Sequence, residues 1–262
     1  MSFLSRSKLE RHACLDRPVR HALAHRQKHL SVSQGGAVMM QPIVSHFAAT
    51  GVEGEGDVEG FAQLAAQSQD GLTLMQADDF APPDGLEFTR RGDGLHLVLE
   101  SPPVLQDSFA FVTLGLSDVP DIMRLVELTE PGPFRQRSIA LGTYIGLRRH
   151  GRLIAMAGER LKPPGFTEIS AVCVAPEFRG KGIAKALVTQ LAWTILSRHE
   201  TPFLHLYSDN LPALALYQSL GFRVRVPIYI LTLVSEHTQA PDIRQLELLT
   251  SAQRVGGDEW WN

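Results

Sequence analysis

The chain has 262 residues, of which 44% are hydrophobic and 20% charged, a balance typical of a globular protein with a buried core. Its formal net charge of −3 argues against a general affinity for nucleic acid, which requires a basic surface. The two cysteines are far apart, no apolar run is long enough to span a membrane, and the basic N-terminus lacks the apolar stretch of a secretion signal. We therefore expect a cytoplasmic protein that binds neither nucleic acid nor a membrane.

The first segment, residues 1–37, is basic and rich in histidine, and we expect it to be helical. His21, His25 and His29 follow a four-residue spacing that would place three imidazoles on one helical face. No cysteine or acidic residue lies among them to complete a ligand set, so we predict an ordinary helix and no bound metal.

Residues 38–107 have the pattern of a small α/β unit and contain no chemical motif. Its expected elements are a strand (38–49), a helix that begins near Asp57, and short strands (72–76, 86–90 and 95–100). We expect this unit to be a separate N-terminal domain. A degenerate half-repeat of the domain that follows is the alternative.

A larger domain is expected from residue 108 to residue 235, with the element order β-α-α-β-β-β-α-β-α-β. These elements are a strand (109–114), a helix (122–128), a short helix (135–141), a hairpin (144–148 and 153–160), a strand (166–175), a long helix after residue 182, a strand (203–208), a helix (214–220) and final strands (223–234). The remaining tail, 236–262, is polar and ends in Trp260-Trp261. It folds back or crosses to a partner subunit, and its sequence favours neither.

The most informative stretch lies between the strand at 166–175 and the long helix. The turn Arg179-Gly180-Lys181-Gly182 opens directly onto a helix, whose first N–H groups are unpaired and carry the positive end of the helix dipole. Gly180 and Gly182 let the backbone curl closely around an anion such as a pyrophosphate. The turn therefore predicts an anion site, although a plain helix cap would use the same residues.

Two nucleotide-binding motifs do not fit this turn. A P-loop needs a Lys-Ser/Thr pair after its last glycine, but Ile183 and Ala184 follow Gly182. A dinucleotide fingerprint needs a glycine at position 185, where the chain has Lys185.

The turn and its surroundings instead resemble the GNAT superfamily of acyl-CoA-dependent N-acetyltransferases, of the bacterial two-part type with an N-terminal extension. The family pattern Arg/Gln-x-x-Gly-x-Gly/Ala is matched by Arg179, Gly182 and Ala184, after the lead-in Val-Ala-Pro-Glu-Phe at 174–178. Asn210 and the Leu-Tyr-x-x-x-Gly-Phe element at 216–222 match the second half of the motif. The resemblance covers residues 109–235. It implies a GNAT fold of the α/β (α+β) class, with a mixed central sheet whose fourth and fifth strands splay apart.

The resemblance further implies that acetyl-CoA is the co-substrate. The backbone of the fourth strand would pair with the pantetheine arm, the amides of the turn would hold the pyrophosphate, and Arg179 and Lys181 would add positive charge. Asn210 would hydrogen-bond the pantetheine amides, and it also fits an ordinary helix N-cap. The full set of expected cofactor-binding residues is Val172, Cys173, Val174, Arg179, Gly180, Lys181, Gly182, Ile183, Ala184, Lys185 and Asn210.

Acetyl transfer requires a neutral amine and benefits from an acid that protonates the departing thiolate. Tyr217 takes the place of that acid in the motif, and a phenol with a pKa of about 10 is protonated at neutral pH; core packing is the other interpretation. Glu168 resembles the base of the histone acetyltransferase branch, and we expect burial to raise its pKa. Glu159, His205 and a water chain are the alternatives for the base.

The acceptor is expected between the loop at 131–138 and the hairpin near 159–166. We predict direct transfer in a ternary complex, without metal or acyl-enzyme, to a primary amine, with a small molecule favoured. The alternatives are a protein lysine or N-terminus as acceptor, or a non-catalytic acyl-CoA-binding regulatory module. The sequence leaves open whether the protein forms a homodimer.

Overall fold

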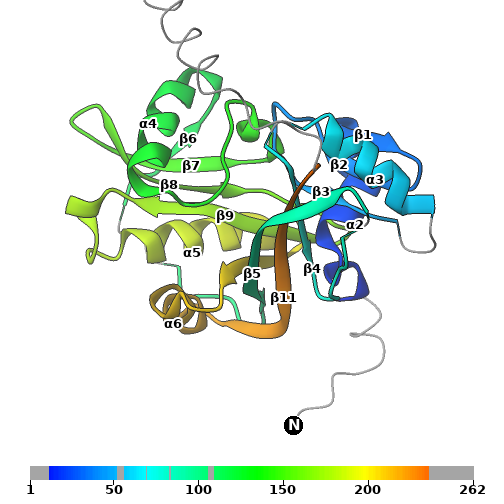
Figure 1. Ribbon diagram of the computed structural model, residues 1–262. Coiled ribbons are helices and arrows are strands. Elements are labelled where there is room, and N and C mark those ends of the chain that lie inside the picture. The colour runs from blue at the N-terminus through cyan, green and yellow to red at the C-terminus, as the bar shows by residue number, and fades with distance from the viewer. Residues whose placement is uncertain (1–11, 52–55, 69, 83, 106–108, 236–262) are drawn as a thin grey trace, which may run out of the picture.

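The computed structural model describes residues 12–51, 56–68, 70–82, 84–105 and 109–235, and the tail expected at 236–262 lies outside these residues. The described chain forms one eight-stranded mixed sheet and a smaller three-stranded sheet, with helices packed against them (Figure 1). Within the described residues, no helix is both long and apolar enough to cross a membrane.

The large sheet has the strand order β4-β11-β5-β10-β9-β8-β7-β6, in which the neighbours β9 and β10 run parallel and the other pairs antiparallel. Its strands span Leu72–Gln76 (β4), Leu86–Leu99 (β5), Val112–Leu114 (β6), Tyr144–Arg149 (β7), Arg152–Glu159 (β8), Phe166–Val174 (β9), Thr201–Tyr207 (β10) and Phe222–Ser235 (β11). The small antiparallel sheet consists of β1 (Ser31–Gln34), β2 (Ala37–Met40) and β3 (Ala48–Ala49).

Helices cover both faces of the large sheet (Figure 1). The two helices that follow β9 and β10 lie on one face, and the helix that follows β6 lies on the other. The α-helices are α2 (Pro18–Ala24), α3 (Gly56–Ala66), α4 (Val119–Thr129), α5 (Ile183–Leu196) and α6 (Leu211–Ser219). Short 3₁₀ turns occur at Ala13–Leu15 (η1), Lys28–Leu30 (η2), Leu116–Asp118 (η3), Ser138–Leu141 (η4) and Pro176–Phe178 (η5).

The large sheet includes strands from both sides of the boundary expected between residues 107 and 108. β4 and β5 belong to the N-terminal part, yet β5 lies between β10 and β11, and β4 pairs with β11. Leu97 and Leu99 of β5 are buried in the same core as Leu187 and Leu191 of α5. An alternating pattern shows that one face of a strand is buried, but not which segment covers it.

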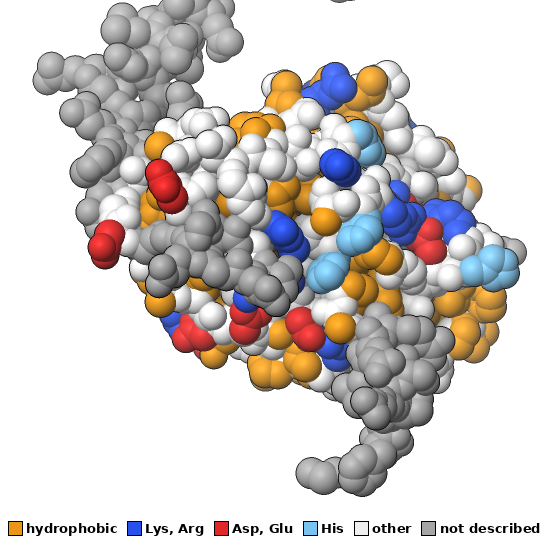
Figure 2. Space-filling model, turned by 90° about the vertical axis from the view of Figure 1, so that its right-hand side faces the viewer, with side chains coloured by type: hydrophobic (Ala, Val, Ile, Leu, Met, Phe, Trp, Pro, Cys, Tyr) orange, Lys and Arg blue, Asp and Glu red, His pale blue; other side chains and the backbone are white. Residues whose placement is uncertain are grey.

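The N-terminal part also differs locally from the expectation. The strand expected at 38–49 is two short strands, because Pro42 has no N–H for a ladder and a turn follows it. The expected histidine-bearing helix ends at Ala24, so His29 falls in η2, while the rings of His21 and His25 stack with centroids 6.1 Å apart. On the face of the molecule shown in Figure 2, histidine side chains lie close to Lys and Arg side chains.

From residue 109 onward the expected order of elements is confirmed. The short helix expected at 135–141 is the 3₁₀ turn η4, and the final strands are the single strand β11, whose register shifts at Val224/Val226 and Thr232/Leu233. The long helix, α5, buries the side chains of Ile183, Leu187, Val188, Leu191 and Ile195.

Candidate active site

β9 and β10 pair over three residues and then separate. The last pair joins Glu168 to Phe203; beyond it β10 continues against β5, and β9 continues against β8. Ala171 has a φ of +53°, and the β8–β9 register shifts between Ser170 and Cys173. A non-glycine residue in the left-handed region is strained, and such strain clusters at functional sites. The expected splay of these two strands is confirmed, and it opens the sheet directly after Glu168.

The edge of β9 that faces the opening carries no paired strand beyond Glu168 within the described residues. From Val172 to Val174 this edge of β9 therefore has no neighbouring strand among the described residues, and an unpaired strand edge can accept an extended ligand as a further strand. Cys173 is buried, and burial raises the pKa of its thiol to about 11. A thiol in this state is a poor nucleophile, which fits a structural role for Cys173.

The end of β9 leads into the turn from Arg179 to Lys185, which we call the anion cradle. Gly180 and Gly182 have φ values of +74° and +77°, in the left-handed region that favours glycine. The first backbone hydrogen bond of α5 runs from Ala186 N to Gly182 O at 3.0 Å, so the amides before Ala186 precede the helical ladder. A Cβ added at either glycine would meet no described atom within 4 Å, and the cradle therefore opens outward.

Two basic residues of the cradle contact nearby backbone carbonyls. Arg179 Nε donates to the carbonyl oxygen of Val174 at 3.2 Å, which ties the cradle to β9. Lys181 Nζ donates to the carbonyl oxygen of Glu177 at 3.3 Å and lies 4.9 Å from the centre of the Phe178 ring. Both side chains keep positive charge beside the exposed amides, as a pyrophosphate site requires.

α6 starts after β10, on the other side of the opening. Asn210 is its N-cap, with Oδ1 accepting from Ala213 N at 3.2 Å, so the cap interpretation is confirmed. Tyr217 is half-buried and packs edge-on against Phe222, with ring centroids 6.1 Å apart. Burial raises the pKa of Tyr217 to about 12, so its hydroxyl is protonated at neutral pH. Packing and a role as acid are therefore compatible.

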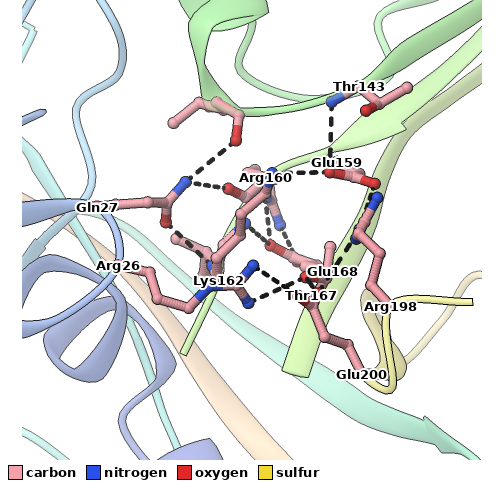
Figure 3. A network of polar contacts seen from close by, with 12 residues as sticks. Arg26, Gln27, Thr143, Glu159, Arg160, Lys162, Thr167, Glu168, Arg198 and Glu200 are labelled. Atoms are coloured by element: carbon pink, nitrogen blue, oxygen red, sulfur yellow. Dashed lines mark hydrogen bonds and ion pairs between the residues drawn. The ribbon is translucent and has the colours of Figure 1, made fainter. Parts of the chain in front are cut away.

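Glu168 is fully buried at the point where β9 and β10 separate, and it belongs to a network of ion pairs (Figure 3). Arg160 donates to both carboxylate oxygens, from Nε to Oε2 at 2.8 Å and from Nη2 to Oε1 at 2.6 Å. The amide of Leu161 donates to Oε2 at 3.2 Å, and Nδ1 of His205 lies 2.6 Å from Oε1. Both oxygens of Glu168 are thus held by donors.

The raised pKa expected for Glu168 is wrong. Burial does raise it, but the charge of Arg160, followed by that of His205, outweighs burial and holds the pKa of this carboxyl well below its usual range. Glu159 is also fully buried, and ion pairs at 2.7 Å with Lys162 and with Arg198 overcome burial and lower its pKa. A carboxylate held in its charged form by paired cations is a weak proton acceptor. Neither glutamate suits the role of base.

Two histidines lie beside Glu168. Nδ1 of His205 contacts Glu168, whereas its Nε2 is buried without a hydrogen-bond partner in the described part of the chain. His96 of β5 pairs with His205 across the strands, and their rings lie edge to face at 4.6 Å. Burial lowers the pKa of His96 well below its usual value. His96 was missed from sequence because β5 was assigned to a separate domain, although a lone histidine among alternating leucines was a visible signal.

The side of the opening expected to hold the acceptor is covered by N-terminal residues. Gln27, which is buried, donates to the carbonyl oxygens of Leu141 at 3.3 Å and Arg160 at 2.7 Å and accepts from Lys162 N at 3.0 Å (Figure 3). The ring of Phe47 lies 4.8 Å from the Arg160 guanidinium. Residues before β4 thus bind the hairpin that was expected to contact the acceptor.

A cavity of about 560 Å³ lies at the paired end of β9 and β10, away from the cradle. It is lined by His12, Val98, Leu99, Glu100, Pro164, Gly165, Phe166, His199 and Thr201. Because the cradle follows the opposite end of β9, we assign this cavity no part in holding CoA. Among the described residues, no group of three or more His, Cys, Asp or Glu side chains is arranged to hold a metal ion.

Comparisons with known proteins agree with this geometry. A family model described as FR47-like protein matches residues 144–230. The chain is 32% identical over 126 residues to the N-alpha-acetyltransferase RimI of Mycobacterium tuberculosis, an alignment that covers 43% of this chain and 78% of that protein. A crystal structure from Novosphingobium aromaticivorans, assigned to the GNAT acetyltransferases, matches with a TM-score of 0.79 and 36% identity over 84% of this chain and 98% of that one. A GCN5-related N-acetyltransferase from Kribbella flavida matches with a TM-score of 0.55 and 14% identity over 82% and 95% of the two chains, which supports the fold alone. The chain belongs to the GNAT superfamily of N-acetyltransferases, enzymes that use acetyl-CoA as co-substrate.

Proposed function

We propose that this enzyme transfers the acetyl group of acetyl-CoA directly to the primary amine of a small molecule. Acetyl-CoA supplies the activated thioester. The backbone of Val172 to Val174 and the cradle amides bind the cofactor along the opening between β9 and β10, and Arg179, Lys181 and Asn210 contribute side chains. Tyr217 supplies the proton that the departing sulfur needs. No step in this assignment requires a metal or an acyl-enzyme.

The proposal of a small acceptor rests on one observation: N-terminal residues cover the side of the opening where the acceptor is expected. Gln27 bridges the carbonyls of Leu141 and Arg160. Ser138 Oγ donates to the carbonyl oxygen of Val44 at 2.7 Å, and Arg135 pairs with Asp70 at 2.5 Å. Both segments expected to hold the acceptor are therefore joined to the N-terminal part, whereas a peptide substrate requires an open groove between them. An enclosed site favours small acceptors.

A protein N-terminus is the second candidate acceptor, and one observation favours it. The relative from M. tuberculosis, named an N-alpha-acetyltransferase, is aligned with this chain over 78% of its own length. The two candidates differ in what they require of the N-terminal part: a small amine fits a site that this part keeps covered, whereas a protein N-terminus needs the acceptor side to be open.

Thiol release from acetyl-CoA by the full chain, measured across small alkylamines, amino acid amides and short peptides with free N-termini, tests the proposal. We expect the highest kcat/KM among the small amines. We also expect Gln27→Ala, which removes the bridge between the two segments, to raise the relative rate on peptides. If peptides are already the best substrates of the unaltered protein, the small-acceptor proposal is wrong. Binding of acetyl-CoA without turnover on any amine would instead support a regulatory module.

A further inference from the structure

We propose that His205 is the group that accepts the proton of the amine, and that Glu168 is its positioning residue. This inference rests on the proposed function, because it assigns a further role within the same site. The two side chains come from the two strands that separate, β10 and β9, and they meet with 2.6 Å between His205 Nδ1 and Glu168 Oε1.

The contact with Glu168 determines which ring nitrogen of His205 is basic. An ionised carboxylate is an acceptor only, so His205 Nδ1 must carry the hydrogen and donate it. The lone pair of the neutral ring is then on Nε2, the atom without a partner among the described residues. A carboxylate that orients a histidine in this way also stabilises the imidazolium after protonation. Glu168 therefore prepares His205 to accept a proton at Nε2.

Arg160 and Leu161 hold Glu168 in place. Three donors fix its two oxygens, at 2.8 and 2.6 Å from Arg160 and at 3.2 Å from the Leu161 amide. This bidentate contact prevents rotation of the carboxylate and keeps it ionised. The low pKa that makes Glu168 a weak base makes it a good orienting group for His205.

The side chain of His205 is enclosed by its neighbours. His96 of β5 lies edge-on at 4.6 Å, and Phe203 of β10 lies 5.5 Å away between ring centroids. Arg225 of β11 donates to the carbonyl oxygen of His12 at 3.1 Å and pairs with Asp16 at 2.6 Å, which holds the N-terminal segment across this face. His205 contacts Glu168 and His96 directly, and the charged or titratable groups that act on these two neighbours are Arg160 on Glu168, and Arg225 and His12 on His96. Binding of the amine has to displace part of this covering, since catalytic contacts commonly form only in the substrate complex.

The proton balance of the step is simple. His205 Nε2 takes one proton from the ammonium group, and the freed lone pair on nitrogen attacks the thioester carbonyl. The carbon–sulfur bond breaks, Tyr217 protonates the sulfur, and the second proton lost by the nitrogen replaces the one that Tyr217 gave. Each acetamide formed therefore leaves one proton on His205, which is released to solvent after the products depart.

Two acceptors of different basicity test this assignment. At pH 7 an alkylamine with a pKa of about 10.4 is neutral in roughly one molecule in 2,500, and it needs a base. An alkoxyamine is already uncharged at that pH and needs none. We expect His205→Gln to lower kcat on the alkylamine by ~10²–10⁴-fold, the usual contribution of a general base, and to change kcat on the alkoxyamine only a few-fold. Glu168→Gln should likewise lower kcat on the alkylamine much more than kcat on the alkoxyamine. His25→Gln, at an exposed position, should leave kcat on both amines unchanged.

Three results would distinguish the failures. Equal losses on both amines would mean that the dyad only holds β9 and β10 together, and unchanged activity on both would place the base elsewhere. If the unaltered protein acetylates neither amine, the proposed function itself fails.

A measurement without any variant covers the case in which His205→Gln does not fold. The kcat of the unaltered protein on the alkylamine should level off well below the pKa of the amine, and a tenfold rise per pH unit up to that pKa would overturn the assignment.

Discussion

The cradle can be tested by adding one negative charge to it. Gly182 has a φ of +77° and faces open space, so a side chain at this position meets no described neighbour. Asparagine and aspartate have the same shape, and both tolerate the left-handed region better than other residues. Comparing Gly182→Asp with Gly182→Asn therefore isolates the charge from the backbone strain, which costs about 1–2 kcal/mol in both variants.

The size of the effect follows from Coulomb's law. A carboxylate about 5 Å from one phosphate charge, at an effective dielectric constant of ~20, is repelled by about 3 kcal/mol. Because the cradle is exposed, salt reduces this to about 1–2 kcal/mol, or roughly 5- to 30-fold in affinity. We expect Gly182→Asp to bind acetyl-CoA more weakly than Gly182→Asn by this factor, and the gap to narrow as salt is added.

Calorimetric titration of each variant with acetyl-CoA measures this difference directly. Thermal unfolding of the two proteins serves as the control, since the strain is shared and their midpoints should agree closely. Equal affinities of the Asp and Asn variants would show that no phosphate lies near Gly182. That result would refute the assignment of the cradle.

Three further predictions concern single residues. Tyr217→Phe should slow single-turnover acetyl transfer and leave the affinity for acetyl-CoA nearly unchanged; weaker binding at an unchanged rate would contradict its role as acid. Glu168→Ala should lower the free energy of unfolding by about 3–5 kcal/mol in denaturant titrations, because it leaves Arg160 buried without a counter-charge, and a loss below 1 kcal/mol would contradict the buried pair. Cys173, with a thiol pKa of about 11, should be about one part in a thousand ionised at pH 8 and should resist alkylation, so rapid modification of the folded protein would contradict its burial.

The sequence predicted the backbone of the turn from Arg179 to Lys185 well because its determinants are local. Gly180 and Gly182 were expected to let the backbone curl closely, and they do so in the left-handed region; the helix after them begins where expected. The order of the strands and helices from residue 109 to residue 235 was predictable for a similar reason. Each strand and helix there has its own apolar periodicity and its own turn residues.

The sequence did not reveal the partners of buried charges. The position of Glu168 in an apolar strand correctly predicted burial, but its counter-ion, Arg160, lies across the turn between β8 and β9. Burial alone would raise the pKa of the carboxyl, whereas the bidentate contact lowers it. A pattern of hydrophobic residues carries no information about which cation faces an acid, so the sign of the shift required the structure.

The place of the N-terminal part was also beyond the sequence. β5 has the pattern of a strand with one buried face, and such a strand fits a separate small sheet as well as a large shared one. The structure inserts it between β10 and β11, which brings His96 beside His205 and closes the site from the N-terminal side. These contacts join residues more than 100 positions apart, and no local signal specifies them.

Direct transfer is the central claim, and one single-turnover experiment tests it. The protein is mixed with one equivalent of acetyl-CoA and an excess of alkylamine, and small products and intact protein are followed by mass spectrometry. The account predicts one acetamide for each CoA thiol released, with no acetylated protein at any time. CoA released without acetamide, or acetylated protein that forms and then decays as acetamide appears, would contradict it.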